Sequence, residues 1–305
     1  MNFLITGGSG FIGRSLVEKL SKIENSKIYV IDKVFFNFNK RNVFFIKGDI
    51  GNTNTLNKVK ANINYIYHLA ANLGVKKIVK FPLESLDNNL LTTRNIIKFS
   101  KKQKKIKRIF FFSTSEVYSI LNKTGKMSEN DNLILPSIHH PRTSYWLSKI
   151  YGEFLTIRSG LPFTIFRVFN IYGPDMKTTH VIPSIFDKLK NKKNPLFENP
   201  NHARCFLYMD DAIKFFIGAL KPTFKNQIVN IANPSEEIKI KDLVKKIKKI
   251  LNNKKKIRYK NIKNLSITRR MPNILKIKKL LKTKIKFTKL DQGLILIKNY
   301  YENKN

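Results

Sequence analysis

Two short stretches of this 305-residue sequence carry the kinds of groups that remove a proton from an alcohol. Tyr145 and Lys149 stand four residues apart at the start of a helical pattern, so both side chains project from one face of that helix. An ammonium group, together with a positively charged cofactor ring, lowers the pKa of a phenol toward neutrality. A phenolate formed in this way is a general base for an alcohol, and we expect Tyr145 and Lys149 to be catalytic.

The second stretch is Ser113–Tyr118, which contains the hydroxyl of Thr114 and the carboxylate of Glu116. It follows a run of β-branched and aromatic residues, Lys107–Phe112, that is typical of a strand. Open α/β sheets bind ligands at the carboxyl ends of such strands. Tyr–Lys pairs at this spacing are common in a lysine-rich chain, so the combination with the hydroxyl cluster is what makes Tyr145 a candidate base. We expect Thr114 to assist it through a hydrogen bond.

A glycine-rich turn at the start of the sequence has the spacing of a dinucleotide site. The strand-like run Asn2–Thr6 leads directly into Gly7-Gly8-Ser9-Gly10-Phe11-Ile12-Gly13 and then into a helical pattern. Glycines at positions 7, 10 and 13 allow a tight turn and the close approach of a pyrophosphate to the helix N-terminus. Asp32, nineteen residues after Gly13, follows the second strand-like run, where a carboxylate binds the adenosine ribose. Because Asp32 would repel a 2′-phosphate, we expect NAD rather than NADP, with Lys33 as the feature against it.

These candidate residues are spaced along an alternating pattern of strands and helices. Strand-like runs stand at Asn2–Thr6, Lys27–Ile31, Val43–Ile46, Asn64–His68, Lys107–Phe112, Phe163–Val168 and Gln227–Ile231. Amphipathic stretches between several of them predict right-handed crossovers and a parallel sheet with helices on both faces, which is a doubly wound α/β fold. We expect a Rossmann domain at residues 1–170, to which residues 204–233 partly return. After Gly173-Pro174 we expect a loopier, smaller substrate lobe at residues 171–305, interwoven with the first.

Taken together, these motifs resemble those of the NAD-dependent nucleotide-sugar epimerase/dehydratase family, within the extended short-chain dehydrogenase/reductases. The matching stretches cover nearly the whole chain: GGSGFIG at 7–13, GDI at 48–50, HLAA at 68–71, Asn89 through Asn95, STSEVY at 113–118, YWLSK at 145–149, FRVFNIYGP at 166–174, HVIP at 180–183, ARCFLYMDDA at 203–212 and RRMPN at 269–273. One departure is Ser119, where the family usually has glycine. The resemblance implies an enzyme that binds NAD and a nucleotide-diphosphate sugar.

The resemblance also implies roles for individual residues. Those implied at the cofactor are Gly7, Gly10, Phe11, Ile12, Gly13, Asp32, Asp49, Ile50, Ala70, Ala71, Tyr145 and Lys149, with Asp49 and Ile50 at the adenine. Those implied at the sugar nucleotide are Asn170, Arg204 and Arg270 at the diphosphate and His180 and Val181 along the nucleotide. Guanidinium groups bind phosphate oxygens in a directed way that lysine cannot match, although ordinary surface salt bridging is the alternative for both arginines.

The reaction after oxidation at sugar C4 is left open by these residues. From a 4-keto sugar, inversion at C4, elimination across C5 and C6, or loss of a C6 carboxylate can follow. Within the resemblance, Glu116 favours the UDP-glucuronate decarboxylase and 4,6-dehydratase branch, because a carboxylate there can abstract a C5 proton or assist at C6. The alternative is a 4-epimerase, in which Glu116 merely hydrogen-bonds its loop. A rival from another class is a non-catalytic NAD- or RNA-binding relative, which we would expect to lack the Tyr145 and Lys149 pair.

The composition is strongly basic, since 59 Lys and Arg residues stand against 20 Asp and Glu residues and give a net charge of +39. The densest runs, 101–105 and 254–256, lack interleaved aromatic residues, and we interpret them as solvated loops or helix ends rather than a specific nucleic-acid site. A single cysteine, Cys205, excludes an internal disulfide and is expected to be a buried filler. We expect no metal and no membrane segment, and a cytoplasmic location. The resemblance implies a homodimer that pairs the helical stretches Asn89–Ser100 and Tyr145–Arg158.

Overall fold

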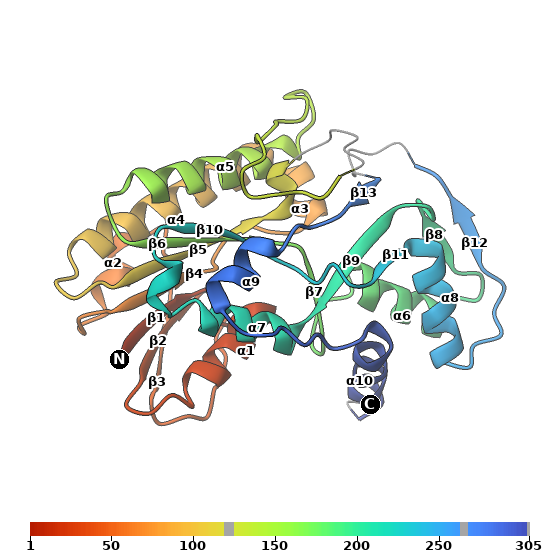
Figure 1. Ribbon diagram of the computed structural model, residues 1–305, viewed down its shortest axis with the longest axis horizontal. Helices are drawn as coiled ribbons and strands as arrows, with labels where there is room; N and C mark the ends of the chain where they lie inside the picture. The colour runs from red at the N-terminus through yellow and green to blue at the C-terminus, as the bar shows by residue number, and fades with distance from the viewer. Residues whose placement is uncertain (119–124, 263–267, 304–305) are drawn as a thin grey trace.

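A seven-stranded parallel sheet lies at the centre of the larger lobe (Figure 1). The computed structural model describes residues 1–118, 125–262 and 268–303, so the expectation about Ser119 lies outside the described residues. The strand order is β10-β6-β5-β4-β1-β2-β3. The bounds are β1 Asn2–Thr6, β2 Lys27–Asp32, β3 Val43–Lys47, β4 Tyr65–His68, β5 Arg108–Thr114, β6 Phe163–Val168 and β10 Gln227–Ile231. All seven strands that the sequence predicts are present, and the predicted fold class is confirmed.

Helices cover both faces of this sheet, as a doubly wound fold requires (Figure 1). One face carries α1 (Phe11–Leu20) and α7 (Met209–Gly218), and the other carries α4 (Pro82–Lys101) and α5 (Thr143–Arg158). Successive strand residues point to opposite faces, so β1 contributes to two separate cores. Phe3 and Ile5 pack in the core with α1 and α7, whereas Leu4 packs with Ile96 of α4. The shorter helices lie on the α4 side: α2 (Thr53–Asn57) shares the core that contains Ile96, and α3 (Val75–Lys80) contacts α4.

The smaller lobe contains more strands than the sequence predicts. One sheet has the order β11-β9-β13 with β7 also paired to β9, and a second consists of β8 and β12. Their bounds are β7 Asn170–Tyr172, β8 Leu196–Glu198, β9 Ala203–Tyr208, β11 Glu237–Lys239, β12 Arg258–Lys260 and β13 Arg269–Arg270. The helices of this lobe are α6 Val181–Asn191, α8 Ile240–Ile250 and α10 Leu290–Glu302, whereas α9 Leu275–Leu281 and the 3₁₀ turns η1 Ser115–Tyr118 and η2 Pro222–Phe224 pack with the larger lobe. The expectation of a loopier lobe was therefore wrong, because strands this short pair with distant partners and carry little periodicity of their own.

The two lobes exchange chain segments. β10 pairs in parallel with β6 at the edge of the large sheet, and α7 packs beside α1. β9, which precedes α7 directly, belongs instead to the small sheet and pairs with β7 and β13. The chain therefore enters the smaller lobe, returns to the larger one for α7 and β10, and returns to it once more for α9, which contacts β10.

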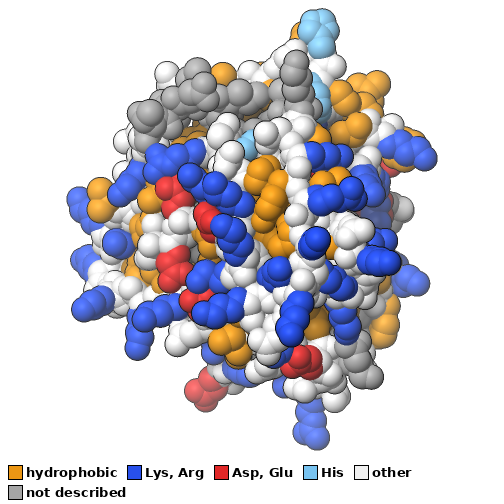
Figure 2. All heavy atoms as spheres, turned by 90° about the vertical axis from the view of Figure 1, so that its right-hand side faces the viewer, with side chains coloured by type: hydrophobic (Ala, Val, Ile, Leu, Met, Phe, Trp, Pro, Cys, Tyr) orange, Lys and Arg blue, Asp and Glu red, His pale blue; other side chains and the backbone are white. Residues whose placement is uncertain are grey.

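Positive charge is spread over the surface. Figure 2 shows Lys and Arg side chains across the face of the smaller lobe, with acidic and apolar side chains between them. The run at 101–105 lies at the end of α4, and the run at 254–256 lies in the loop between α8 and β12. Within the described ranges, no helix combines the length and the apolar character needed to cross a membrane.

Candidate active site

The carboxyl ends of the parallel strands bring the predicted cofactor residues to one edge of the large sheet. The turn after β1 contains Gly7, Gly10, Phe11, Ile12 and Gly13, β2 ends at Asp32, Asp49 and Ile50 follow β3, and Ala70 and Ala71 follow β4. β5 ends at Thr114, directly beside β4 and β6. This edge is where doubly wound folds bind ligands, so the sequence-predicted cofactor and catalytic residues lie where one site can use them together.

The glycine-rich turn lies too close to neighbouring backbone for side chains at two positions. Gly7 has φ +75°, and a Cβ there would lie 2.7 Å from the backbone nitrogen of Ala70. A Cβ on Gly13 would lie 2.4 Å from the carbonyl oxygen of Gly7. Gly10 stands exposed as the N-cap of α1 and donates its N–H to the Gly7 carbonyl over 3.1 Å. The N-terminus of α1 thus presents bare backbone, which fits the pyrophosphate of a dinucleotide.

Asp32 is held against this turn by backbone donors. Its Oδ2 accepts a hydrogen bond from the Ser9 N–H at 3.0 Å, and its Oδ1 accepts one from the Val34 N–H at 3.1 Å. Lys33, the residue that weighed against NAD, forms an ion pair with Asp49 at 2.7 Å. Burial raises the pKa of Asp49, but the hydrogen bonds from Lys33 and the Gly51 N–H and the charge of Lys33 together lower it by more. The pKa of Asp49 is therefore below its ordinary value. The Lys33 ammonium is therefore paired with the Asp49 carboxylate.

Tyr145 lies beside Thr114 and Glu116. The Thr114 hydroxyl hydrogen-bonds the phenol, and the same hydroxyl oxygen accepts the backbone N–H of Glu116 at 3.2 Å. Burial, and then the negative charge of Glu116, raise the pKa of Tyr145 well above its ordinary value. The sequence predicts a lowered pKa for Tyr145, which is the opposite direction. That prediction included the positive charge of a cofactor ring but neither the burial of the phenol nor the charge of Glu116. The protein groups alone therefore keep Tyr145 protonated.

Lys149 is buried one helical turn below Tyr145. Its Nζ donates to the carbonyl oxygen of Phe112 at 2.8 Å and lies 5.9 Å from the centroid of the Tyr145 ring. Burial lowers the pKa of Lys149 to about 8, while the charge of Glu153 raises it. Lys149 therefore remains mostly protonated at neutral pH, as a group that supports a phenolate must.

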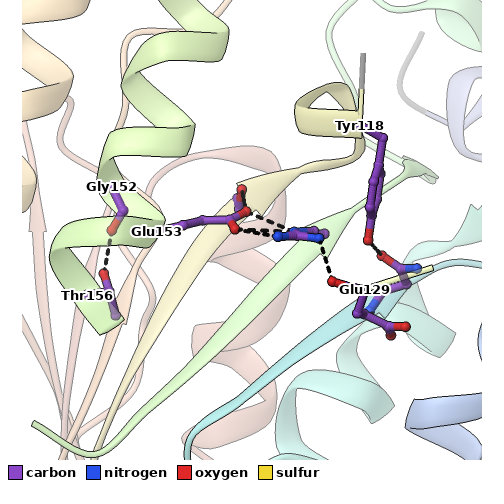
Figure 3. Close-up of polar contacts among 8 residues, drawn as sticks. Tyr118, Glu129, Gly152, Glu153 and Thr156 are labelled. Carbon is purple, nitrogen blue, oxygen red and sulfur yellow. Dashed lines mark hydrogen bonds and ion pairs between the residues drawn. The ribbon is translucent and has the colours of Figure 1, made fainter. Parts of the chain in front are cut away.

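A buried polar network anchors the helix that carries Tyr145 (Figure 3). Glu153 accepts hydrogen bonds from Ser113 Oγ at 2.5 Å and from Arg167 Nη2 at 2.8 Å. The side chains of Glu153 and Arg167 are almost fully buried. Arg167 Nη1 also donates to the Glu129 carbonyl at 3.2 Å. The network joins α5 to β5 and β6, so it fixes the position of Tyr145 relative to the end of β5. Sequence reasoning missed Glu153, although its spacing of four from Lys149 placed it on the same helix face.

Arg142 is a second residue that sequence reasoning missed. Its Nη2 donates to Glu116 Oε1 at 2.6 Å, and the two side chains retain only 19% and 16% of their exposure. Arg142 precedes α5 as its N-cap, three residues before Tyr145. The scarcity of arginine in a lysine-rich chain was the signal that could have identified it.

The predicted substrate residues divide into two groups. β13 pairs with β9 so that Arg270 stands opposite Arg204, and both residues are buried. Arg270 Nη1 donates to Ser115 Oγ at 3.4 Å, which brings this pair of arginines to the end of β5. Asn170 on β7 donates to the Cys205 carbonyl at 3.2 Å. His180 and Val181 lie at the start of α6 and are exposed.

Burial governs the charge of two residues in β9. It lowers the pKa of Arg204 to about 9, and the neighbouring Arg270 lowers it further. Burial also raises the pKa of the Cys205 thiol to about 12. Cys205 is therefore an unreactive thiol in the core, as a filler is, whereas Arg204 gains from an anion placed beside it.

A family model described as the NAD dependent epimerase/dehydratase family matches residues 3–232. The chain belongs to this family, and it is an enzyme whose cofactor is NAD. The glycine turn, Asp32 and the buried Tyr145 and Lys149 pair fit that cofactor and that class.

Within the family, the chain is similar to proteins named for three different reactions. It is 31% identical to a UDP-N-acetyl-alpha-D-glucosaminuronate decarboxylase of Bacillus cytotoxicus, over 91% of this chain and 90% of that protein. A dTDP-glucose 4,6-dehydratase of Bacillus anthracis, solved with NAD, superposes with a TM-score of 0.85 at 27% identity over 99% of this chain and 97% of that one. A UDP-glucuronic acid 4-epimerase of Bacillus cereus, solved with UDP-glucuronic acid and NAD, reaches 0.88 at 26% identity over 100% of both chains. These names do not agree on one reaction.

Proposed function

We propose that this enzyme binds a nucleotide-diphosphate sugar and converts it through transient oxidation at C4 of the sugar. The observation that carries the proposal is the placement of Thr114, Tyr145 and Lys149 together at the sheet edge that also holds the glycine turn. The rival reading as a non-catalytic relative is disfavoured, because Tyr145 and Lys149 are both present and both lie at this edge.

Tyr145 is the proposed base for the sugar 4-hydroxyl. The phenol takes the hydroxyl proton, and Thr114 holds the phenol by its hydrogen bond. Bound NAD supplies the acceptor for the hydrogen that leaves C4 with its electron pair and adds the positive charge that lowers the pKa of the phenol. Lys149 contributes a second positive charge from below. The product of this step is a 4-keto sugar.

Glu116 supports decarboxylation or 4,6-dehydration as the step that follows. A 4-keto sugar with a carboxylate on C5 is a β-keto acid, which loses CO₂ and takes up a proton before hydride returns to C4. In a 4,6-dehydration, a base removes the C5 proton, the C6 hydroxyl leaves as water, and hydride then returns to C6 while a proton returns to C5. Glu116 is proposed to remove the C5 proton in a dehydration, or to deliver the proton that C5 takes up after a decarboxylation. The second candidate is 4-epimerisation, favoured by the 4-epimerase similarity.

We propose that the remaining predicted residues bind the sugar nucleotide from the smaller lobe. Arg204 and Arg270 are assigned to the diphosphate, with Asn170 beside them, and His180 and Val181 are assigned to the nucleotide. Division into a NAD-binding part at residues 1–170, with 204–233 returning to it, and a substrate lobe at 171–305 is consistent with this placement. A cytoplasmic location is proposed as well, because the cytoplasm supplies both NAD and nucleotide sugars.

Mass spectrometry of products tests the proposed function. The protein is incubated with NAD and separately with UDP-glucose, UDP-glucuronate, UDP-N-acetylglucosamine and dTDP-glucose. We expect one of them to be converted, with loss of CO₂ for a decarboxylase, loss of water for a dehydratase, or an unchanged mass and a new retention time for an epimerase. If none of the four sugar nucleotides is converted, the proposal is contradicted.

Asp32 is expected to make the enzyme prefer NAD over NADP. A 2′-phosphate would stand against the Asp32 carboxylate, so NADP should bind at least about tenfold more weakly, equivalent to about 1.4 kcal/mol. Calorimetric titration of both dinucleotides measures this ratio. Asp32→Asn should reduce the preference for NAD over NADP. Asp87→Asn, at an exposed position on α4, should leave the ratio of the two affinities unchanged. Tighter binding of NADP than of NAD by the unaltered protein would refute the assignment.

The enzyme is proposed to be a homodimer that pairs α4 and α5 with the same helices of a second copy. The two helices pack side by side, and their outer surface exposes Leu83, Leu91, Phe154 and Ile157. Apolar side chains gathered on two neighbouring helices are typical of a helix–helix interface. Light scattering should report twice the monomer mass, and Phe154→Asp should shift it toward the monomer. A monomer mass for the unaltered protein at all concentrations would rule the dimer out.

A further inference from the structure

Arg142 is held in a fixed position relative to Tyr145. Its carbonyl oxygen accepts the Tyr145 N–H at 3.1 Å, and its own N–H donates to His140 Nδ1 at 3.1 Å. The guanidinium lies 5.3 Å from the ring centroid of the buried Trp146 and donates to Glu116 at 2.6 Å. A cation that stacks on an indole and pairs with a carboxylate is oriented on two sides. Its remaining donors therefore point in a defined direction.

Three charged side chains at this site carry buried atoms that lack a hydrogen-bond partner among the described residues. They are the Oε2 atom of Glu116, the Nε atom of Arg142 and the Nε atom of Arg270. Buried polar atoms without partners are costly, and in native proteins such atoms commonly mark a functional site. Two of the three are N–H donors on cations and one is a carboxylate acceptor. The two guanidinium donors are complementary to a ligand that offers acceptors, and Glu116 Oε2 is complementary to a hydroxyl donor such as one on a sugar.

The same three residues lie close to the phenol that acts on C4. The charges of Arg142 and Arg270 lower the pKa of Tyr145, and that of Glu116 raises it. When Tyr145 contacts the 4-hydroxyl, the neighbouring ring substituents are the 3-hydroxyl and the group on C5, and of these two only the group on C5 can carry a carboxylate. A carboxylate on C5 offers two oxygens with about four lone-pair positions, and guanidinium groups match that geometry. A hydroxymethyl group offers one neutral oxygen and leaves a donor unpaired.

We propose that Arg142 is a specificity-determining residue that recognises an acidic substituent on C5, so that the substrate is a nucleotide-linked uronic acid. Arg270 Nε supplies the second donor, since a guanidinium has five N–H groups and can serve two partners. Glu116 then orients Arg142 as well as facing the sugar. This inference rests on the proposed function and narrows its substrate class. It also gives a role to a residue that lies outside the Tyr–Lys pair and the glycine turn.

Binding of two matched probes tests the role of Arg142. UDP-glucuronate and UDP-glucose share the nucleotide and the diphosphate and differ only at C6, so the ratio of their Kd values isolates the acidic group. The titrations use NAD-loaded protein in the Tyr145→Phe background, which prevents turnover during the measurement. We expect UDP-glucuronate to bind at least about tenfold more tightly than UDP-glucose, which corresponds to the loss of one charged hydrogen bond.

Variants at Arg142 separate recognition from a structural role. Arg142→Gln is expected to remove most of the preference by weakening UDP-glucuronate alone. Arg142→Lys keeps a cation without the planar fork, so it should retain an intermediate ratio, and it serves if the Gln variant does not fold. Arg258→Gln, an exposed arginine on β12, is the matched control and should leave both Kd values unchanged.

Each outcome of these titrations bears on the inference. An unaltered ratio in Arg142→Gln and Arg142→Lys, or equal weakening of both probes, would overturn the role of Arg142 and leave the proposed function standing. Equal binding of both probes before any change at Arg142 would overturn the uronic acid. If neither probe binds the NAD-loaded protein, the inference fails, whereas the proposed function is decided separately by the conversion assay with the four sugar nucleotides.

Discussion

Tyr145→Phe is expected to lower conversion of the sugar nucleotide by about 10²- to 10⁴-fold, the range that one general base contributes. The substitution removes the phenol oxygen that takes the 4-hydroxyl proton and keeps the ring that packs beside Thr114. Binding of NAD should change little, because the glycine turn and Asp32 are untouched. Product formation by mass spectrometry and NAD affinity by calorimetry, measured on the same preparation, check both parts of the expectation.

Tyr151→Phe is the control for this substitution. Tyr151 lies on the same helix, but its side chain is on the exposed surface, so loss of its hydroxyl should leave conversion intact. If Tyr145→Phe kept nearly full turnover, Tyr145 would be removed from the mechanism. If it lost NAD affinity as well, the loss of activity would reflect a damaged cofactor site instead of a missing base.

Glu116→Gln is expected to separate the oxidation at C4 from the step at C5 or C6. Glutamine keeps the shape of the side chain and can still accept a hydrogen bond from Arg142, but it can neither remove the C5 proton, as dehydration requires, nor deliver a proton to C5 after CO₂ leaves. In a decarboxylase or dehydratase, oxidation at C4 should continue while the later step slows by about 10²- to 10⁴-fold. Reduced cofactor should then accumulate on the enzyme, visible by its near-ultraviolet absorbance, together with a keto sugar in the mass spectrum.

A 4-epimerase predicts a different result for the same variant. Its ketone is presented to the cofactor by the opposite face and reduced, so no base is needed at C5. Inversion at C4 should then proceed at nearly the unaltered rate, and such a result would move the assignment from decarboxylase or dehydratase to epimerase. Glu84→Gln, at an exposed position in the first turn of α4, controls for a simple change of charge.

The larger lobe follows closely from the sequence because its strands carry their own signals. Runs such as Asn2–Thr6 and Phe163–Val168 are apolar, five or six residues long and separated by helical patterns, and both stand as strands with the predicted bounds. β5 runs two residues beyond its predicted end, so Ser113 and Thr114 belong to the strand itself. The longer strand still ends at the same sheet edge, so the hydroxyls of Ser113 and Thr114 lie at that edge.

The rest of the site depended on contacts that a linear pattern does not contain. β13 has only two residues, and it becomes a strand because β9, more than sixty residues earlier, offers it backbone partners. Arg142 lies in the loop before α5 and becomes part of the site because it pairs with Glu116, which lies in the turn after β5. The raised pKa of Tyr145 likewise reflects burial by surrounding elements, which spacing along one helix does not reveal.

The fate of deuterium at sugar C4 tests the central claim most directly. UDP-glucuronate and dTDP-glucose, each labelled with deuterium at C4, are converted in ordinary water by protein loaded with NAD. Transient oxidation predicts that the product keeps the deuterium, at C4 after decarboxylation or epimerisation and at C6 after dehydration, because the bound cofactor carries it without exchange. Formation of a product that has lost the deuterium to solvent, or equal conversion by protein stripped of NAD, would contradict the account.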